Sequence, residues 1–291
     1  MYCKHFGFSK KPFDVTPDHR FLYLTRAHRE ALAAIMYGIR ERRGFVTLVG
    51  EAGTGKTTLL RAALSRLDKN TKSAFIFNSE LPFLQVMALI LDELGALQPV
   101  KKLTLVSAVR RLNDFAVKQF AQGGNVVIMV DEAQNYDPKT IEGLRLLSNL
   151  ESGEHKMIQV VLAGQPELDS KLSQRAMQQF AQRISLRRTT AALDEKHTYD
   201  YIRHRLKIAG YRGADIFSKK AMNLIWHHSG GIPRKINILC DNALLNAFGL
   251  GQKKIQAIGV AEAVNDLTFG KSSVTGIKPR KRFSQLKAAV F

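Results

Sequence analysis

The chain has 291 residues, of which 45% are hydrophobic and 24% charged, which suffices for one large domain or two moderate ones with a buried core. With only two cysteines, Cys3 and Cys240, no disulfide framework is implied. The sequence contains no run of about 18 apolar residues, the length needed to span a membrane. The formal net charge of +19 favours polyanionic partners such as nucleic acid, anionic lipid or nucleotide.

The order of predicted elements divides the chain into four parts. Residues 1–43 begin irregularly and end in a helix predicted over about residues 26–42. Their start, MYCKHFGFSKKPF, lacks the apolar core of a signal peptide, so we expect a cytoplasmic protein. Residues 44–190 alternate strands with helices, residues 191–268 show at least three helical patterns and no strand signal, and residues 269–291 form a basic tail.

The alternating part predicts an α/β domain with a mostly parallel sheet. We expect its strands at Phe45–Val49, Ala74–Asn78, Val126–Asp131, Ile158–Ala163 and Ile184–Arg187. Between them we expect helices that include Leu84–Leu94, Leu105–Phe120 and Pro138–Leu150.

The segment GEAGTGKTT, between the first strand and a helix, has the spacing of a phosphate-binding loop, G-x-x-x-x-G-K-[ST]. Glycines let such a loop curl so that its backbone N–H groups and the following helix N-terminus face an anion. We expect Lys56 to reach the outer phosphates and the Thr57 hydroxyl to bind Mg²⁺; the alternative is an ordinary strand-to-helix turn. The candidate nucleotide-binding residues here are Gly50, Glu51, Ala52, Gly53, Thr54, Gly55, Lys56, Thr57 and Thr58.

The segment VVIMVDEAQ supplies the carboxylates that a nucleotide site needs, because the acidic pair follows five apolar residues of a central strand. Ligands of open α/β sheets bind beyond the carboxyl ends of the strands, where this pair arrives. Asp131 is the candidate metal ligand, and Glu132 is the candidate base that orients and deprotonates the attacking water. An acidic pair after a strand is common on its own, so this interpretation depends on the phosphate-binding loop.

The next strand ends in the turn Gly164-Gln165-Pro166. Gln165 would lie at the same edge of the sheet, where it could sense the γ-phosphate or hold the water. A plain turn residue is the alternative.

Arginines after this turn are candidates for a group that stabilises the charge developing during phosphoryl transfer, often on a neighbouring subunit. Arg183, at a helix-to-strand junction in FAQRISLRRTTAAL, is the first candidate for this finger, and Arg187 and Arg188 are the runners-up. Solvated surface arginine is the alternative for each.

Arg234 is placed in the first turn of a helix by the segment SGGIPRKINILCDNALLNAF. A cation has the unfavourable sign for that end of a helix, unless an anion binds there too. We therefore expect Arg234 to contact the γ-phosphate and report nucleotide state; a solvated first-turn arginine is the alternative.

Taken together, these motifs and the front segment FGFSKKPFDVTPDHRFLYLTRAHREALAAIMYGI resemble the AAA+ ATPases of the ExeA family, also called general secretion pathway protein A, over about residues 2–268. The resemblance implies an AAA+ fold, an α/β P-loop core followed by a small helical lid. It implies ATP and Mg²⁺ as cofactors, Asp131 and Glu132 as the acidic pair, Arg234 as the second sensor and Arg183 as the finger. It also implies that Phe13 and Tyr23, in the first segment, lie near the adenine.

The same resemblance implies a role in assembling the outer-membrane secretin pore of type II secretion, with a homo-oligomeric ring and a secretion-system or membrane-anchored partner. Relatives of this kind continue into a transmembrane helix, whereas this sequence stops at Phe291. Its ending, KPRKRFSQLKAAVF, places basic residues before an apolar start, as a segment at the inner face of the cytoplasmic membrane does; a solvated tail is the alternative. Shorter relatives resemble the ATPases that accompany transposases, which makes an ATP-dependent DNA-binding regulator the second hypothesis. The charge predicts DNA binding without sequence preference under either.

Overall fold

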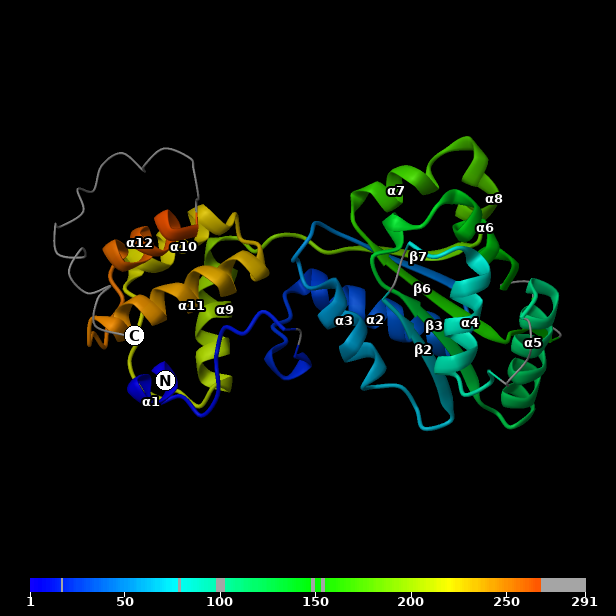
Figure 1. The fold of residues 1–291 in the computed structure, drawn as a ribbon, viewed down its shortest axis with the longest axis horizontal. Helices are drawn as coiled ribbons and strands as arrows, with labels where there is room; N and C mark the ends of the chain where they lie inside the picture. The colour runs from blue at the N-terminus through cyan, green and yellow to red at the C-terminus, as the bar shows by residue number, and fades with distance from the viewer. Residues whose placement is uncertain (17, 78–79, 98–102, 148–149, 153–154, 268–291) are drawn as a thin grey trace. The chain divides into compact units, whose positions relative to one another are not determined.

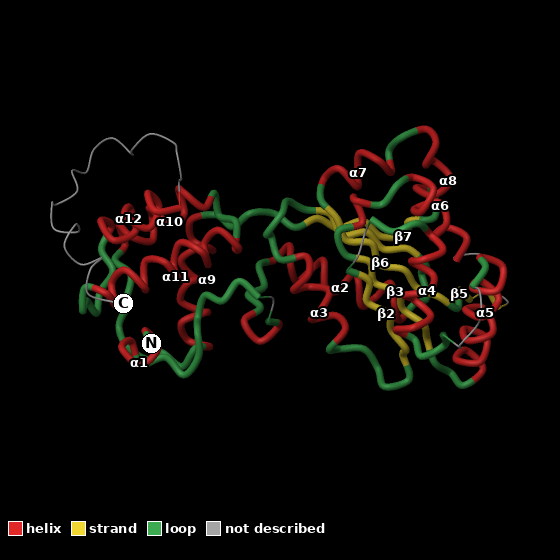
Figure 2. Tube along the Cα trace, viewed as in Figure 1, coloured by secondary structure: helices red, strands yellow, loops and turns green. Residues whose placement is uncertain are grey.

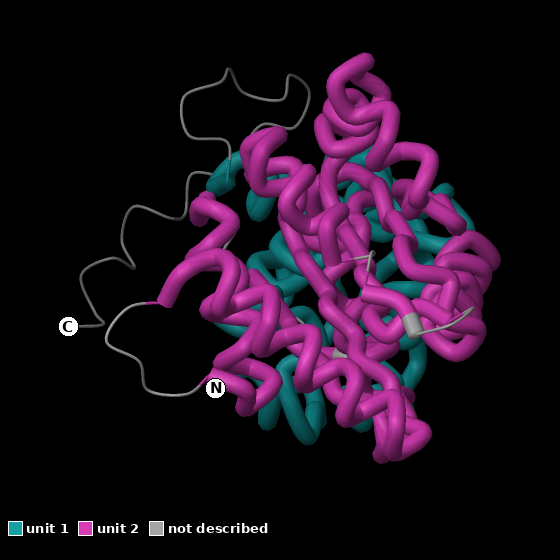
Figure 3. The backbone as a smooth tube through the Cα atoms, turned by 90° about the vertical axis from the view of Figure 1, so that its right-hand side faces the viewer, with its two compact units in different colours: residues 1–15, 193–231, 235–291 teal, residues 16–192, 232–234 magenta. Residues whose placement is uncertain are grey.

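The structure is a computed structural model that describes residues 1–267 except 17, 78–79, 98–102, 148–149 and 153–154 (Figure 1). The predicted tail, residues 269–291, therefore lies outside the described residues. The chain divides into two compact units, which Figure 3 colours separately. An α/β unit comprises residues 16–192 and 232–234, and a helical unit comprises residues 1–15, 193–231 and the chain from residue 235.

The α/β unit contains a five-stranded parallel sheet in the order β2-β3-β6-β1-β7, visible in yellow in Figure 2. Its strands are β1 (Phe45–Val49), β2 (Thr71–Ile76), β3 (Asn125–Val130), β6 (Ile158–Gly164) and β7 (Ile184–Thr189). All five strands were predicted. The boundaries of β1 match, whereas β2 begins three residues before the predicted start. The antiparallel hairpin of β4 (Glu151–Ser152) and β5 (His155–Lys156) was not predicted.

Helices cover both faces of the sheet because its central strands bury every side chain, as β3 does from Asn125 to Val130. Alternate residues point to opposite faces, so Val126 and Ile128 join one core cluster, whereas Val127 and Met129 join the other. The first cluster packs under α4 (Phe83–Glu93), α5 (Leu105–Ala121) and α6 (Pro138–Leu147). The second packs under α2 (Arg26–Arg40) and α3 (Lys56–Leu64). Along the chain, the short helices α7 (Pro166–Leu172) and α8 (Gln178–Ala181) connect β6 to β7.

The helical unit is built from α9 (Glu195–Ile208), α10 (Lys219–Ser229), α11 (Pro233–Gly249) and α12 (Ala257–Leu267), together with α1 (Tyr2–Phe6). The first two residues of α11 are assigned to the α/β unit. As the sequence predicted, its described residues form no named strand; the nearest feature is a single bridge between Phe217 and Ile255. Among the described residues, no helix combines the length and the hydrophobicity needed to cross a membrane.

The predicted first segment, residues 1–43, is divided between the units. Residues 1–15 belong to the helical unit, and residues from 16 onward belong to the α/β unit. Buried Arg205 holds the first part in place, because its guanidinium donates hydrogen bonds to the carbonyl oxygens of Pro12 (2.6 Å) and Asp14 (3.1 Å). The ring of Phe13 is fully buried and packs edge-on against Phe217, so it is a core residue of the helical unit in this structure.

Candidate active site

The carboxyl ends of three strands bring the candidate residues to one edge of the sheet. β1 ends at Val49 before the phosphate-binding loop, β3 ends at Val130 before Asp131, and β6 ends at Gly164 before Gln165. Parallel pairing of β1 with β6, and of β6 with β3, places these ends side by side. The topology thus builds one site from three chain segments far apart in sequence.

The loop from Gly50 to Thr58 curls tightly between β1 and α3. Gly53 and Gly55 have φ angles of +82° and +102°, which favour glycine because a Cβ is strained there. Lys56 begins α3, and its buried ammonium donates hydrogen bonds to the carbonyl oxygens of Gly50 (2.7 Å) and Glu51 (3.1 Å). Burial lowers the pKa of Lys56, although the nearby Glu132 and Asp131 charges oppose this.

Thr57 and Asp131, the two candidate metal ligands, are in direct contact. The Thr57 hydroxyl donates a 2.5 Å hydrogen bond to Asp131 Oδ2, and the backbone N–H of Glu132 donates to Asp131 Oδ1 at 3.0 Å. Asp131 is only 2% exposed, and burial raises its pKa, whereas the hydrogen bond from Thr57 lowers it. A hydroxyl and a carboxylate are the hard oxygen donors that Mg²⁺ prefers, so this pair fits the metal.

Glu132 has a left-handed backbone conformation, with φ +53°, which is uncommon for a residue other than glycine. Its carboxylate Oε2 accepts a hydrogen bond from Gln134 Nε2 at 2.7 Å and a longer one from Gln165 Nε2 at 3.4 Å. The structure therefore brings the candidate base and the candidate sensor Gln165 together, as the sequence predicted from the shared sheet edge.

Arg234 contacts the loop through its backbone. Its N–H donates a hydrogen bond to the Gly53 carbonyl oxygen at 3.3 Å, and a Cβ at residue 53 would come within 2.8 Å of the Arg234 Cβ. Residues 232–234 belong to the α/β unit, so this contact lies within that unit. A role of the Arg234 guanidinium toward a phosphate stays a prediction.

Arg183 lies at the opposite edge of the sheet. It precedes β7, whose first residue pairs with Phe45 at the start of β1, whereas the phosphate-binding loop follows the end of β1. Five strand residues separate the two edges by roughly 16 Å. Arg183 is 4.0 Å from Glu151, Arg187 on β7 pairs with Asp169 at 3.3 Å, and Arg188 donates a hydrogen bond to the Arg187 carbonyl oxygen. None of these three contacts joins an arginine to the loop.

Three polar residues that support the site were missed by the sequence analysis: His28, Gln134 and Thr190. A ring nitrogen of buried His28, Nε2, lies 3.0 Å from the Thr54 carbonyl oxygen, and the hydroxyl of Thr190 lies 2.8 Å from that of Thr54. Gln134 bridges Glu132 and Gln165. A lone polar residue has no spacing pattern that could identify it. The one available signal was the position of Gln134, two residues after Glu132 in the segment VVIMVDEAQ.

The chain is similar to known proteins in sequence and in fold. The AAA domain family matches residues 39–172. The chain is 41% identical over 278 residues, 96% of its length, to "General secretion pathway protein A" of Aeromonas hydrophila, and it spans about half (49%) of that relative's length. In fold it is similar to Cdc6p from Pyrobaculum aerophilum, with a TM-score of 0.69 and 17% identity over 89% of this chain and 71% of that one. It is also similar to the Aeropyrum pernix ORC2 protein in ADPNP and ADP complexes, with a TM-score of 0.66 and 17% identity over 88% of this chain and 73% of that one.

Proposed function

We propose that the chain is a member of the AAA+ ATPase family related to general secretion pathway protein A, and that it binds ATP with Mg²⁺ and hydrolyses it to ADP and phosphate. One observation carries this proposal: the Thr57 hydroxyl contacts Asp131 at 2.5 Å, and the charges of Asp131 and Glu132 act on the buried ammonium of Lys56. A phosphate-binding loop and an acidic pair 74 residues apart thus form a single site.

Each residue has a role that follows from its chemistry. The backbone N–H groups of residues 50–58 and the N-terminus of α3 bind the phosphates, and Lys56 adds a positive charge. Thr57 and Asp131 would hold Mg²⁺, which when bound neutralises charge on the phosphates. Glu132 orients and deprotonates the attacking water, and Gln165 holds the other side of the water or the γ-phosphate. Arg234, whose backbone N–H is hydrogen-bonded to the Gly53 carbonyl oxygen of the loop, responds to the nucleotide.

In this proposal a homo-oligomeric ring completes the site. Arg183 is separated from its own phosphate-binding loop by the length of β1, which supports a finger that acts on a neighbouring subunit. The transition state would then be stabilised only in the assembled protein.

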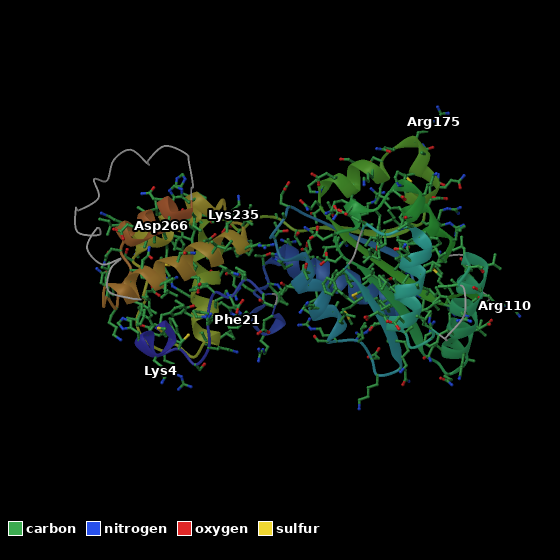
Figure 4. All side chains as sticks on the ribbon, in the orientation of Figure 1. Lys4, Phe21, Arg110, Arg175, Lys235 and Asp266 are labelled. Carbon is green, nitrogen blue, oxygen red and sulfur yellow. The ribbon has the colours of Figure 1, made fainter. Side chains whose placement is uncertain are left out.

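For the cellular process, we propose a role with a secretion system, at the inner face of the cytoplasmic membrane. The similarity to general secretion pathway protein A over 96% of this chain supports this proposal. The second candidate is an ATP-dependent DNA-binding regulator, which the net charge of +19 favours. Exposed cations occur on both units: Figure 4 labels Arg110 and Arg175 of the α/β unit and Lys4 and Lys235 of the helical unit.

The test is ATP binding and turnover by the purified chain with Mg²⁺ and by two variants. Lys56→Ala should abolish binding because the phosphates lose their buried cation, whereas Glu132→Gln should keep binding and stop hydrolysis because only the base is lost. Hydrolysis by Glu132→Gln at the wild-type rate would refute the assigned base. Adding duplex DNA at physiological salt distinguishes the two candidate functions. A change in the rate of ATP turnover supports the DNA-binding regulator, whereas an unchanged rate supports the secretion role.

A further inference from the structure

Gln134 is a buried amide at the candidate active site to which the proposed mechanism gives no role. It is 7% exposed and lies in the short 3₁₀ turn Ala133–Asn135 after the acidic pair. Burying an amide is costly unless its polar atoms find partners. The partners of this amide include the candidate base and the backbone of the candidate sensor, and Nε2 also donates a longer hydrogen bond to Asn135 Oδ1 at 3.3 Å.

Both ends of the Gln134 amide are used. Nε2 donates a hydrogen bond to Glu132 Oε2 at 2.7 Å, and Oε1 accepts one from the backbone N–H of Gln165 at 3.0 Å. These partners fix the orientation of the amide, because a carboxylate requires a donor and an N–H requires an acceptor. Reversing the amide would place its oxygen against the Glu132 carboxylate, acceptor against acceptor, and its NH₂ group against the Gln165 N–H, donor against donor.

The surrounding residues hold Gln134 in this position. Gly164 provides the space, since a Cβ there would lie 3.0 Å from Gln134 Oε1 and 2.8 Å from the nearest atom of the Leu168 side chain. Lys171 Nζ fixes the backbone of the turn by donating hydrogen bonds to the carbonyl oxygens of Gln134 and Tyr136. The Glu132 side chain therefore meets a fixed donor.

We propose that Gln134 is a positioning residue that couples Glu132 to Gln165, so that the base and the sensor adopt their working positions together. This inference rests on the proposed hydrolysis, because Glu132 acts as a base only if ATP is cleaved. The direct bond from Gln165 Nε2 to Glu132 is the longer of the two, at 3.4 Å against 2.7 Å, so Gln134 is the main hydrogen-bond link between them. Holding a base within a fraction of an ångström is worth a large factor in rate.

The test is the Gln134→Met variant, which keeps the length of the side chain and removes its hydrogen bonds. We expect kcat to fall by about tenfold to a hundredfold while KM and ATP affinity stay at wild-type values, because the phosphate-binding loop is untouched. The control is Gln159→Met, a buried amide on β6 that binds the Gly44 N–H (2.8 Å) and the Lys156 carbonyl oxygen (2.8 Å) and should leave kcat unchanged. A kcat for Gln134→Met within about twofold of wild type, or a rise in KM alone, would overturn the coupling.

A second measurement does not depend on hydrolysis. Hydrogen exchange of the Gln165 amide in the nucleotide-free protein should be about fivefold faster in Gln134→Met, because that N–H loses its acceptor. Gln134→Glu keeps an oxygen acceptor and loses the donor, so it should protect the Gln165 amide and still lose turnover. If the wild-type chain cleaves no ATP, the proposed function fails while the exchange arm still decides whether Gln134 joins the two segments. Unchanged exchange in Gln134→Met refutes that link.

Discussion

Individual glycines of the phosphate-binding loop are required for different reasons. Gly53 and Gly55 have positive φ angles, whereas Gly50 does not and is instead packed closely. A Cβ on Gly50 would lie 2.7 Å from the Thr190 carbonyl oxygen and 3.0 Å from the Thr54 hydroxyl. Thr190 in turn donates its N–H to the Val49 carbonyl oxygen, so this oxygen belongs to a fixed segment. The residue after β7 therefore sets the space available to the loop.

We expect Gly50→Ala to weaken ATP binding by at least about tenfold, because the loop or the segment at Thr190 must shift. The matched control is Gly249→Ala at the end of α11, where a Cβ meets nothing within 4 Å. It should leave ATP affinity unchanged and stabilise the protein by about 0.5–1 kcal/mol. Titration with a fluorescent ATP analogue and thermal melts measure both. Wild-type affinity for Gly50→Ala would contradict the packing argument.

The residues of the site that the sequence predicted are those in motifs with fixed spacing. Lys56 and Thr57 follow from the glycine pattern, and the contact between Thr57 and Asp131 follows from strand ends that share an edge. His28 and Thr190 could not be found in this way. Their role is a tertiary contact with Thr54 across 26 and 136 residues, and neither has a sequence neighbour that reveals it.

At the level of elements, long periodic segments were predicted well and short or mixed ones were not. β2 was expected from Ala74, where its apolar residues begin, but pairing with β3 extends it back to Thr71 through partly exposed residues. α1 has five residues and the β4–β5 hairpin has two per strand, so neither offers enough residues for a period to be detected. Several helices begin at capping side chains, among them Thr25 before α2, Thr104 before α5 and Ser218 before α10.

The cap of α9 gives a stability prediction that depends on pH. Asp194 accepts hydrogen bonds from the His197 N–H at 2.7 Å and from its ring Nδ1 at 2.9 Å, and the backbone bond is the main reason why the pKa of Asp194 is lowered. A lowered pKa means that the stabilisation is present above the unfolded-state value of about 3.9 and is lost as pH falls through the folded value.

Asp194→Ala should therefore lower the free energy of unfolding of the helical unit by about 1 kcal/mol at neutral pH, and by less in acid. Asp194→Asn is the control, since an amide oxygen also caps a helix and does not titrate near these values. Thermal melts at neutral pH and at about pH 3 compare the three proteins. An Asn variant as unstable as the Ala variant at neutral pH would show that the cap is not the cause.

For the whole molecule, the arrangement of the arginines bears on assembly. Arg183, just before the amino end of β7, is separated by the length of β1 from the loop at the carboxyl end of β1 in the same chain. The sequence marked Arg183 as a candidate finger but could not say on which edge it lies, because that depends on strand order. In an oligomer in which Arg183 faces the phosphate-binding loop of the next subunit, the arginine could act on the nucleotide bound there.

Arg183→Ala should bind ATP normally and hydrolyse it up to about a thousandfold more slowly. Mixed with Lys56→Ala, it should recover part of the activity, since each variant supplies what the other lacks at a shared site. Turnover across a series of mixing ratios measures this, with light scattering to establish that the two proteins assemble together. Co-assembly without recovery at any ratio would exclude a finger from the neighbour.

The division of the chain between its two units also sets an order of events during synthesis. Residues 16–192 contain every strand of the α/β unit, and they leave the ribosome before most of the helical unit exists. Tyr2, Phe8 and Phe13 are translated before the α/β unit, yet they contact Asp241, Tyr211 and Phe217, which are translated much later. At about 5–20 residues per second, translation leaves these aromatic side chains without their native contacts for on the order of ten seconds or more. Residues 2–13 thus reach their native packing only after the strands of the α/β unit have been synthesised.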